Sequence, residues 1–142
     1  HKGHDTIGLG IVKGFGTTCG ALASTVSHDS HNLTVVYDSA ENALMAANAL
    51  IQCGGGMSAV KDGRLLHVLE LPLAGLISLK DATELAKDSQ VMKEANRELG
   101  LTGLENPLLR IVTLALPVIP KVKMSDLGMV DVLRKELIPL FV

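Results

Sequence analysis

The chain has 142 residues, of which 47% are hydrophobic and 20% are charged, and its formal net charge is −2. This balance is typical of one globular domain with a sizeable core and excludes an intrinsically disordered chain. The thirteen basic residues are scattered, and Phe15, Tyr37 and Phe141 are the only aromatic residues, so we expect no nucleic-acid partner.

No segment is typical of a membrane or secretory protein. The most apolar stretch, 108–120, contains Arg110 and two prolines, whereas a spanning helix needs roughly 18 uninterrupted apolar residues. Residues 1–5 lack the basic tip and apolar core of a signal peptide. Cys19 and Cys53 are too few for a disulfide framework or a zinc knuckle. We therefore expect no membrane partner and a cytoplasmic location, and the absent initiator Met predicts a cut or processed chain.

The first third of the chain is rich in glycine and then in strand-forming residues. A short apolar run at 9–12 lies between glycines and predicts a strand between turns. Apolar and small polar residues alternate over 21–26, and a β-rich run follows at 33–37, which predicts two further strands. The polar residues 27–32 interrupt them.

A helix is predicted after the second of these strands. Asp38 with Glu41 three residues later forms a capping-box pattern, and the triplet 54–56 of glycines predicts the end of the helix. The expected apolar side consists of residues at helical spacing, namely Leu44, Ala47 and Ile51, widened by Ala43 and Leu50.

Two hairpins are predicted in the second half. Asp62-Gly63 separates apolar runs at 57–60 and 64–71, a strong hairpin signal. The alternating segment 121–132 contains turn residues at 126–128 and predicts a closing hairpin.

A longer helix is predicted over 81–99, whereas 108–116 fits either a buried strand or a short helix that ends before Pro117. Helices interleaved with hairpins predict a single α+β domain over residues 1–142. Its sheet is expected to be mixed, largely antiparallel and covered by two or three helices.

Two glycine clusters have structural explanations. Gly8-Leu9-Gly10 resembles the start of a dinucleotide fingerprint, but the third glycine comes one place late at Gly14, and no long helix follows. Turns and close backbone packing explain these glycines, and a helix stop explains 54–56. Cys19 and Cys53 have no adjacent base and are interpreted as small buried hydrophobic residues.

The densest polar cluster is His28-Asp29-Ser30-His31-Asn32, between two predicted strands. Imidazole transfers protons near neutral pH and binds metals, and Asp29 can orient a histidine. The same residue types also form polar β-turns through side-chain bonds to the backbone. Residue types alone leave both interpretations open.

A metal site within this chain alone is not expected. Two histidines and one acid are fewer ligands than a closed zinc site needs, so others would have to come from His1, His4 and Asp5 or from another domain. His67 lies alone in an apolar strand, and we interpret it as a residue on the exposed face.

The chain resembles the carboxy-terminal domain of bacterial adenine deaminases. The resemblance runs in order from end to end and rests on these strings: Gly14-Phe15-Gly16, Gly20-Ala21, Ala23 to Asn32, Ala47-Asn48, Gly54-Gly55-Gly56, Val60 to Gly63, Leu71 to Leu76, Asn106-Pro107, Leu114 to Pro120, Gly128 to Asp131 and Pro139-Leu140-Phe141. The His-Asp-Ser-His-Asn and Leu-Pro-Val-Ile-Pro strings are the most specific of them.

The resemblance implies a part of an enzyme that hydrolyses adenine to hypoxanthine and ammonia in purine salvage. It also implies an upstream (β/α)8 barrel of the amidohydrolase type, with a divalent metal (Mn, Fe or Zn), as partner of this domain, and a homo-oligomer. This chain is too short for such a barrel, which needs about 250 residues, and it has no His-x-His pair. The isolated chain is therefore predicted to be inactive and to bind no metal alone.

Two functional hypotheses follow from different classes. In the first, residues 28–32 contact the substrate or the active site of the barrel, and replacing His28 or His31 lowers kcat/KM. In the second, the domain is a structural or oligomerisation module with no direct role in catalysis. The same replacements then change stability or oligomer size while the kinetics hold.

Overall fold

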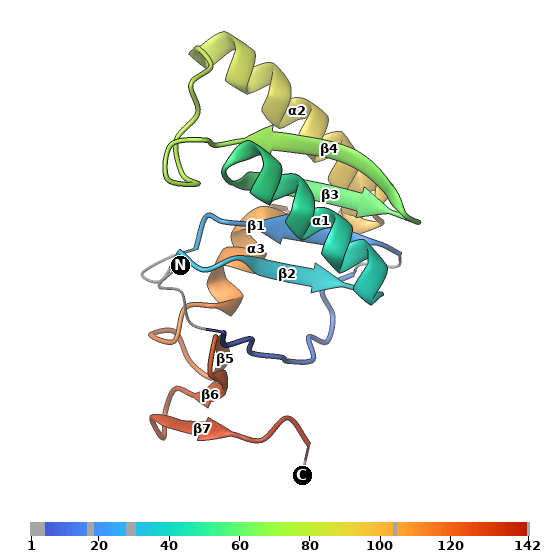
Figure 1. The fold of residues 1–142 in the computed structure, drawn as a ribbon. Coiled ribbons are helices and arrows are strands. Elements are labelled where there is room, and N and C mark those ends of the chain that lie inside the picture. The colour runs from blue at the N-terminus through green and yellow to red at the C-terminus, as the bar shows by residue number, and fades with distance from the viewer. Residues whose placement is uncertain (1–4, 17–18, 28–30, 104, 142) are drawn as a thin grey trace.

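The computed structural model of the chain describes residues 5–16, 19–27, 31–103 and 105–141 (Figure 1). Within them, helices combine with two antiparallel sheets, ordered β2-β1-β3-β4 and β5-β6-β7. The elements are β1 (Ala21–Ser24), β2 (Thr34–Tyr37), α1 (Ala40–Cys53), β3 (Gly56–Lys61), β4 (Arg64–Glu70), α2 (Ala82–Glu98), the 3-10 helix η1 (Leu101–Gly103), α3 (Pro107–Leu114), β5 (Val122–Ser125), β6 (Gly128–Asp131) and β7 (Glu136–Ile138). The predicted α+β class is confirmed, with two sheets in place of one mixed sheet.

The four-stranded sheet separates two apolar layers. Side chains alternate across a strand, so Ala21 and Ala23 of β1 face α1, whereas Leu22 faces the layer beneath α2 and α3. In Figure 1, α1 lies in front of the sheet, and α2 and α3 lie behind it. All three of these strand residues are fully buried, which makes β1 the centre of the core.

Helix α1 begins one residue later than its sequence predicts. Ser39 is the N-cap, and its Oγ accepts a hydrogen bond from the Asn42 backbone N–H at 3.3 Å. The carboxylate of Asp38 instead accepts the Gly20 N–H at 2.7 Å and the Asn42 Nδ2–H at 2.8 Å. The prediction of Asp38 as N-cap is therefore wrong, because this side chain ties the helix to the start of β1.

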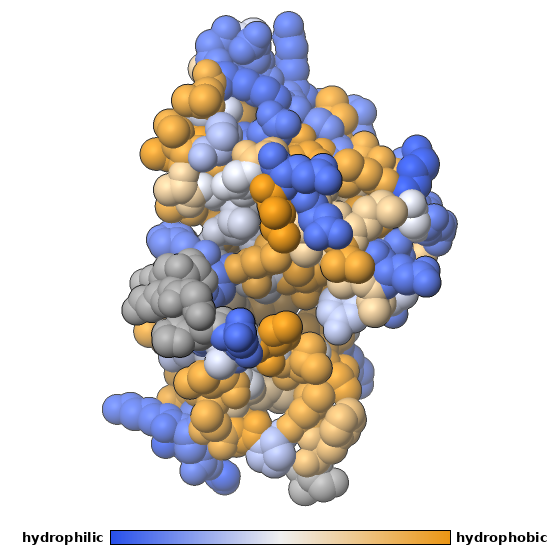
Figure 2. All heavy atoms as spheres, viewed as in Figure 1, coloured by the Kyte–Doolittle hydropathy of each residue, from blue (hydrophilic) through white to orange (hydrophobic). Residues whose placement is uncertain are grey.

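The buried side of α1 agrees with the predicted one at Leu50 but differs from it at Leu44 and Ile51. Asn42, Ala46 and Leu50 are buried against the sheet, whereas Leu44 is 63% exposed and Ile51 is 72% exposed. Polar contacts set this rotation, because Asn42 also accepts the Gly63 N–H at 2.9 Å. Apolar residues therefore gather on the outer side of α1, on the face of the molecule that Figure 2 shows.

Stability is expected to fall at low pH through Asp38. The hydrogen bond from Asn42, followed by the Gly20 N–H, holds the pKa of this carboxyl below its ordinary value of 3.8. A lowered pKa means that the folded state binds fewer protons, so the stabilisation is present above pH 3.8 and is lost as the pH falls through the folded-state pKa. Replacing Asp38 with alanine should lower the melting temperature at pH 7. This difference from the wild type should shrink toward pH 2, as measured by calorimetry at both values.

The other predicted helix and hairpins are confirmed with small shifts. The side chain of Asp81 caps α2 by accepting the N–H groups of Thr83 and Glu84 at 2.8 and 2.9 Å. The segment 108–116, for which the sequence left strand and helix open, contains most of helix α3. The helix begins at Pro107, and the missing N–H of proline loses no hydrogen bond there, because the first N–H groups of a helix have no partner within it. No helix in the described part of the chain is long and apolar enough to cross a membrane.

The smaller sheet lies beside the first described residues of the chain. The Thr6 hydroxyl donates to Asp126 at 3.0 Å, and Gly8 lies so close to the Ser125 carbonyl that no side chain would fit. Gly10 likewise lies against the Met124 side chain. The predicted strand at 9–12 is absent from the described structure, because this segment approaches β5 through its glycines without joining a ladder.

Candidate functional site

The predicted polar loop, residues 28–32, lies in the connection between β1 and β2, and Thr25 at the start of this connection holds it to the main sheet. The Thr25 backbone N–H donates to the Gly56 carbonyl at 2.9 Å. The Thr25 hydroxyl donates to the Gly75 carbonyl at 2.7 Å and accepts the Gly56 N–H at 2.8 Å. Thr25, three residues before His28, is therefore fixed to both β3 and the turn after β4.

The structure describes only part of the predicted site. His28, Asp29 and Ser30 lie outside the described residues, so their predicted contacts stay predictions. His31 is exposed, and its backbone N–H donates to the Ser27 carbonyl at 3.2 Å. Its φ of 49° is left-handed, a conformation that histidine adopts several times more often than most residues. This end of the loop therefore presents an imidazole to solvent.

Ser27 and Asn32 flank the loop in different environments. Ser27 is 1% exposed, and its hydroxyl has no hydrogen-bond partner among the described residues. Asn32 is half-buried. A buried hydroxyl without a partner is costly in an isolated domain, because its desolvation is not compensated.

The described residues do not form a metal centre. They contain no group of three His, Cys, Asp or Glu side chains placed to hold an ion. Asp5 is exposed, and His1 and His4 lie outside the described residues. Among the described residues, therefore, no donor set beside His31 would hold the divalent metal that the family resemblance implies for the barrel.

His67 has a structural environment. Its Nε2 lies 2.8 Å from Oδ1 of Asp88 in α2, and Oδ2 of the same carboxylate accepts the Lys80 ammonium at 2.8 Å. The two atoms are within ion-pair distance, but Nε2 makes no hydrogen bond of good geometry within the described part of the chain. The hydrogen bond to Asp88 raises the pKa of Lys80. The prediction that His67 faces solvent is wrong, because Asp88 covers it.

The Cys53 thiol is held by backbone carbonyls in the described structure. Cys53 is half-buried at the end of α1, and its thiol donates to the carbonyls of Leu50 and Gly55 at 3.5 and 3.2 Å. Cys19 is half-buried as well. No described helix follows the Gly8-Leu9-Gly10 string, so the requirements of a dinucleotide loop are not met there.

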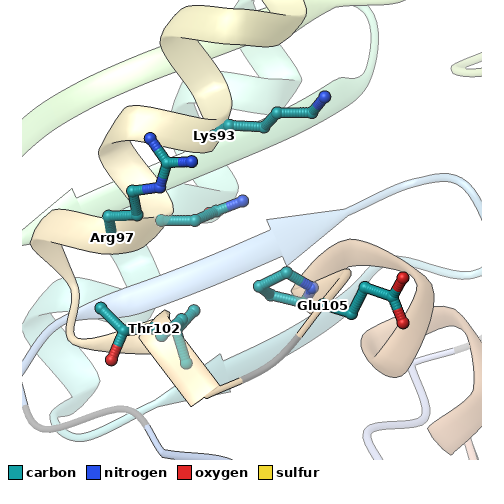
Figure 3. A pocket seen from close by; sticks show the side chains of 7 residues that line it. Lys93, Arg97, Thr102 and Glu105 are labelled. Carbon is teal, nitrogen blue, oxygen red and sulfur yellow. The ribbon is translucent and has the colours of Figure 1, made fainter.

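A groove on the back of the sheet was not predicted from the sequence. Helices α2 and α3 both pack on the sheet rather than on each other, and a cavity of about 1050 Å³ lies between them. A smaller cavity of about 210 Å³ adjoins it and shares Lys93, Asn96, Glu105 and Pro107 (Figure 3). Asn96 is 3% exposed, and its Oδ1 has no hydrogen-bond partner among the described residues. The sequence could have indicated that Asn96 is buried, because it lies one helical turn after Met92 on the buried side of α2.

Comparison with known proteins gives a family for the whole chain. The family model described as "Adenine deaminase C-terminal domain" matches residues 1–136. The chain is 48% identical over 140 residues to an adenine deaminase of Bacillus velezensis, with 99% of this chain and 24% of that protein covered. It is 44% identical over 140 residues to that of Moorella thermoacetica, covering 99% and 23%, and 44% identical over 132 residues to that of Bacillus subtilis, covering 93% and 23%.

The chain spans about a quarter of the length of these relatives. The family match covers every string of the resemblance except Pro139-Leu140-Phe141, and it includes the strings around His31 and Pro117. The chain therefore belongs to the adenine deaminase C-terminal domain family.

Proposed function

We propose that this chain works as the carboxy-terminal domain of an adenine deaminase, which hydrolyses adenine to hypoxanthine and ammonia. The family match over residues 1–136 carries this proposal, supported by relatives of that name at 44–48% identity. Since the chain covers about a quarter of those relatives, we assign the barrel, with its divalent metal, to the polypeptide that precedes this domain.

In this proposal, residues 28–32 contribute side chains to the active site of the barrel. Hydrolysis adds water at the carbon that carries the amine and then expels ammonia, so the leaving nitrogen must be protonated. An imidazole near neutral pH is suited to hydrogen-bond the purine or to pass that proton. The exposure of His31 and the anchoring of the loop by Thr25 support this role, because a contributing side chain needs both access and a fixed base.

The test replaces His31 with asparagine in the full-length enzyme. Asparagine tolerates the left-handed backbone at this position but has no imidazole. We expect kcat/KM for adenine to fall about a hundred-fold, the lower end of what a positioned proton-transfer group contributes. Steady-state kinetics and the melting temperature are measured on the same preparation.

A second histidine supplies the matched control. His67→Ala removes a half-buried ring beside Asp88, so it should lower the melting temperature while kcat/KM stays within about two-fold of the wild type. If His28→Ala and His31→Asn both leave kcat/KM unchanged in a folded enzyme, the loop has no role in catalysis.

The alternative function is a structural or oligomerisation module. One observation favours it, namely the exposed apolar stripe of Leu44 and Ile51 on α1. Under this alternative His31→Asn changes the melting temperature or the oligomer size, measured by light scattering, while the kinetics hold.

A further inference from the structure

We infer that the groove between α2 and α3 is the docking site for an apolar, acidic segment of the polypeptide that precedes this domain in the full-length protein. This inference rests on the proposed function, because it takes that preceding polypeptide as the partner. It assigns an occupant to a surface on the side of the sheet opposite α1.

The shape and lining of the groove fit a length of polypeptide. Its walls come from α2 and α3 and its floor from the sheet, with these apolar residues along it: Val26, Met57, Leu69, Leu71, Leu85 and Met92. Its volume of about 1050 Å³ is at the top of the range of small-molecule pockets, roughly 300–1000 Å³. An extended segment that inserts several apolar side chains would fill the groove, whereas a single purine would leave most of its volume filled with water.

The buried amide at one end supplies a polar requirement. Asn96 is buried beside the apolar lining, and its Oδ1 accepts no hydrogen bond from the described residues. A buried acceptor without a donor destabilises the domain, because the loss of its hydration is not compensated. The Asn96 oxygen is not accessible in the free domain, so a backbone N–H of the docked segment reaches it only once the Asn96 side chain turns into the groove.

The charge around the groove predicts the sign of its partner. Lys93 and Arg97 lie beside Glu105 in the smaller cavity (Figure 3), and Arg110 lines the larger one, so three positive charges face one negative charge. None of these four side chains forms an ion pair within the described part of the chain. The surface is positive although the chain as a whole has a net charge of −2. An acidic side chain in the docked segment would therefore be held at the rim.

The relatives are long enough to contain such a segment outside the part that matches this chain. About three quarters of each relative lies outside the match to this chain, and the match is to their carboxy-terminal domain. The groove also includes Val26, two residues before the polar loop begins. A segment docked there would fix the orientation of the domain beside the part of the protein that residues 28–32 are proposed to reach.

The experiment compares amide hydrogen exchange in the full-length protein with exchange in the 142-residue chain. We expect the amides of α2 and α3 that line the groove to exchange at least about ten-fold more slowly in the full-length protein. Leu109→Glu places a charge on the α3 wall at a side chain that is 53% exposed, so the domain keeps its fold but loses this protection. Leu44→Glu, at 63% exposure on the opposite face, is the matched control and should leave the protection unchanged.

A second variant tests the amide. Asn96→Leu keeps the size of the side chain but removes the acceptor, so the 142-residue chain should melt at the same or a higher temperature. In the full-length protein the same change should reduce groove protection about ten-fold, because the donated hydrogen bond is lost. If Asn96→Leu changed amide exchange in the groove equally in the 142-residue chain and in the full-length protein, Asn96 would act only in the core of the domain. That result would overturn its docking role.

Other outcomes identify other occupants and contradict the inference. Equal exchange rates in the two proteins mean that nothing from the preceding polypeptide covers the groove. Protection of the 142-residue chain by added adenine means a small-molecule site, and protection that rises with its concentration means a second copy. If Leu44→Glu loses the protection and Leu109→Glu keeps it, the docking surface is on α1. The kinetics of His31→Asn are independent of these results, so failure of the loop role and failure of the docking role are separable.

Discussion

Replacing Leu50 with alanine is expected to lower the free energy of unfolding by about 2–5 kcal/mol. Leu50 is 2% exposed and packs with Ala21, Ala46 and Val60 between α1 and the sheet. Its neighbours are small or lie on a central strand, so they cannot close the space that the missing atoms leave. Urea unfolding of the 142-residue chain, extrapolated to water, measures the change.

Leu44 on the same helix is the control for this result. It has the same side chain and the same helical backbone but is 63% exposed, so Leu44→Ala should change the free energy of unfolding by no more than about 0.5 kcal/mol. If Leu44→Ala cost as much as Leu50→Ala, helix α1 would be rotated as the sequence pattern alone predicts.

Replacing Gly56 with alanine is the second large expected loss, about 2–5 kcal/mol from steric overlap together with backbone strain. Gly56 has a φ of 141° at the start of β3, and a Cβ atom there would overlap the Leu69 carbonyl of the neighbouring strand. Relief of that overlap would separate β3 from β4 or break the hydrogen bonds that the Gly56 carbonyl and N–H form with the Thr25 N–H and hydroxyl. Urea unfolding again gives the free energy.

Gly63 is the matched glycine. It also has a positive φ, 71°, but a Cβ atom there would meet nothing within 4 Å. Gly63→Ala should therefore cost only the left-handed strain, about 1–2 kcal/mol. A similar loss for both variants would show that backbone strain, rather than the close approach of Leu69, determines the requirement for glycine at Gly56.

The sequence predicted correctly those turns and helix ends that depend on residues only a few positions apart. The Asp62-Gly63 turn, the Asp81 cap and the hairpin around residues 126–128 are confirmed because turn and cap chemistry acts over two to four positions. The rotation of α1 was mispredicted because contacts that are distant in sequence set it. Asn42 is drawn inward by the Gly63 N–H, 21 residues away, and no periodicity of apolar residues records that bond.

The same reasoning explains what the sequence showed of the candidate site. Residues 28–32 stand out in the sequence because five polar residues interrupt two strands, and the structure places the described His31 on the surface. The groove beside Asn96 was missed because its residues come from four separate elements and the connections between them. Most of its apolar lining consists of ordinary core residues. Only their arrangement leaves space between α2 and α3.

The contact between Thr6 and Asp126 joins residues 120 positions apart, and this separation has a consequence for the order of folding. All four strands of the main sheet lie before residue 71, so that sheet can assemble while the rest of the chain is still on the ribosome. The segment around Gly8 and Gly10 is made before the sheet, yet its neighbours in β5 are made near the end. Because closing so long a loop is entropically costly, the small sheet should be the last unit to form and the first to open.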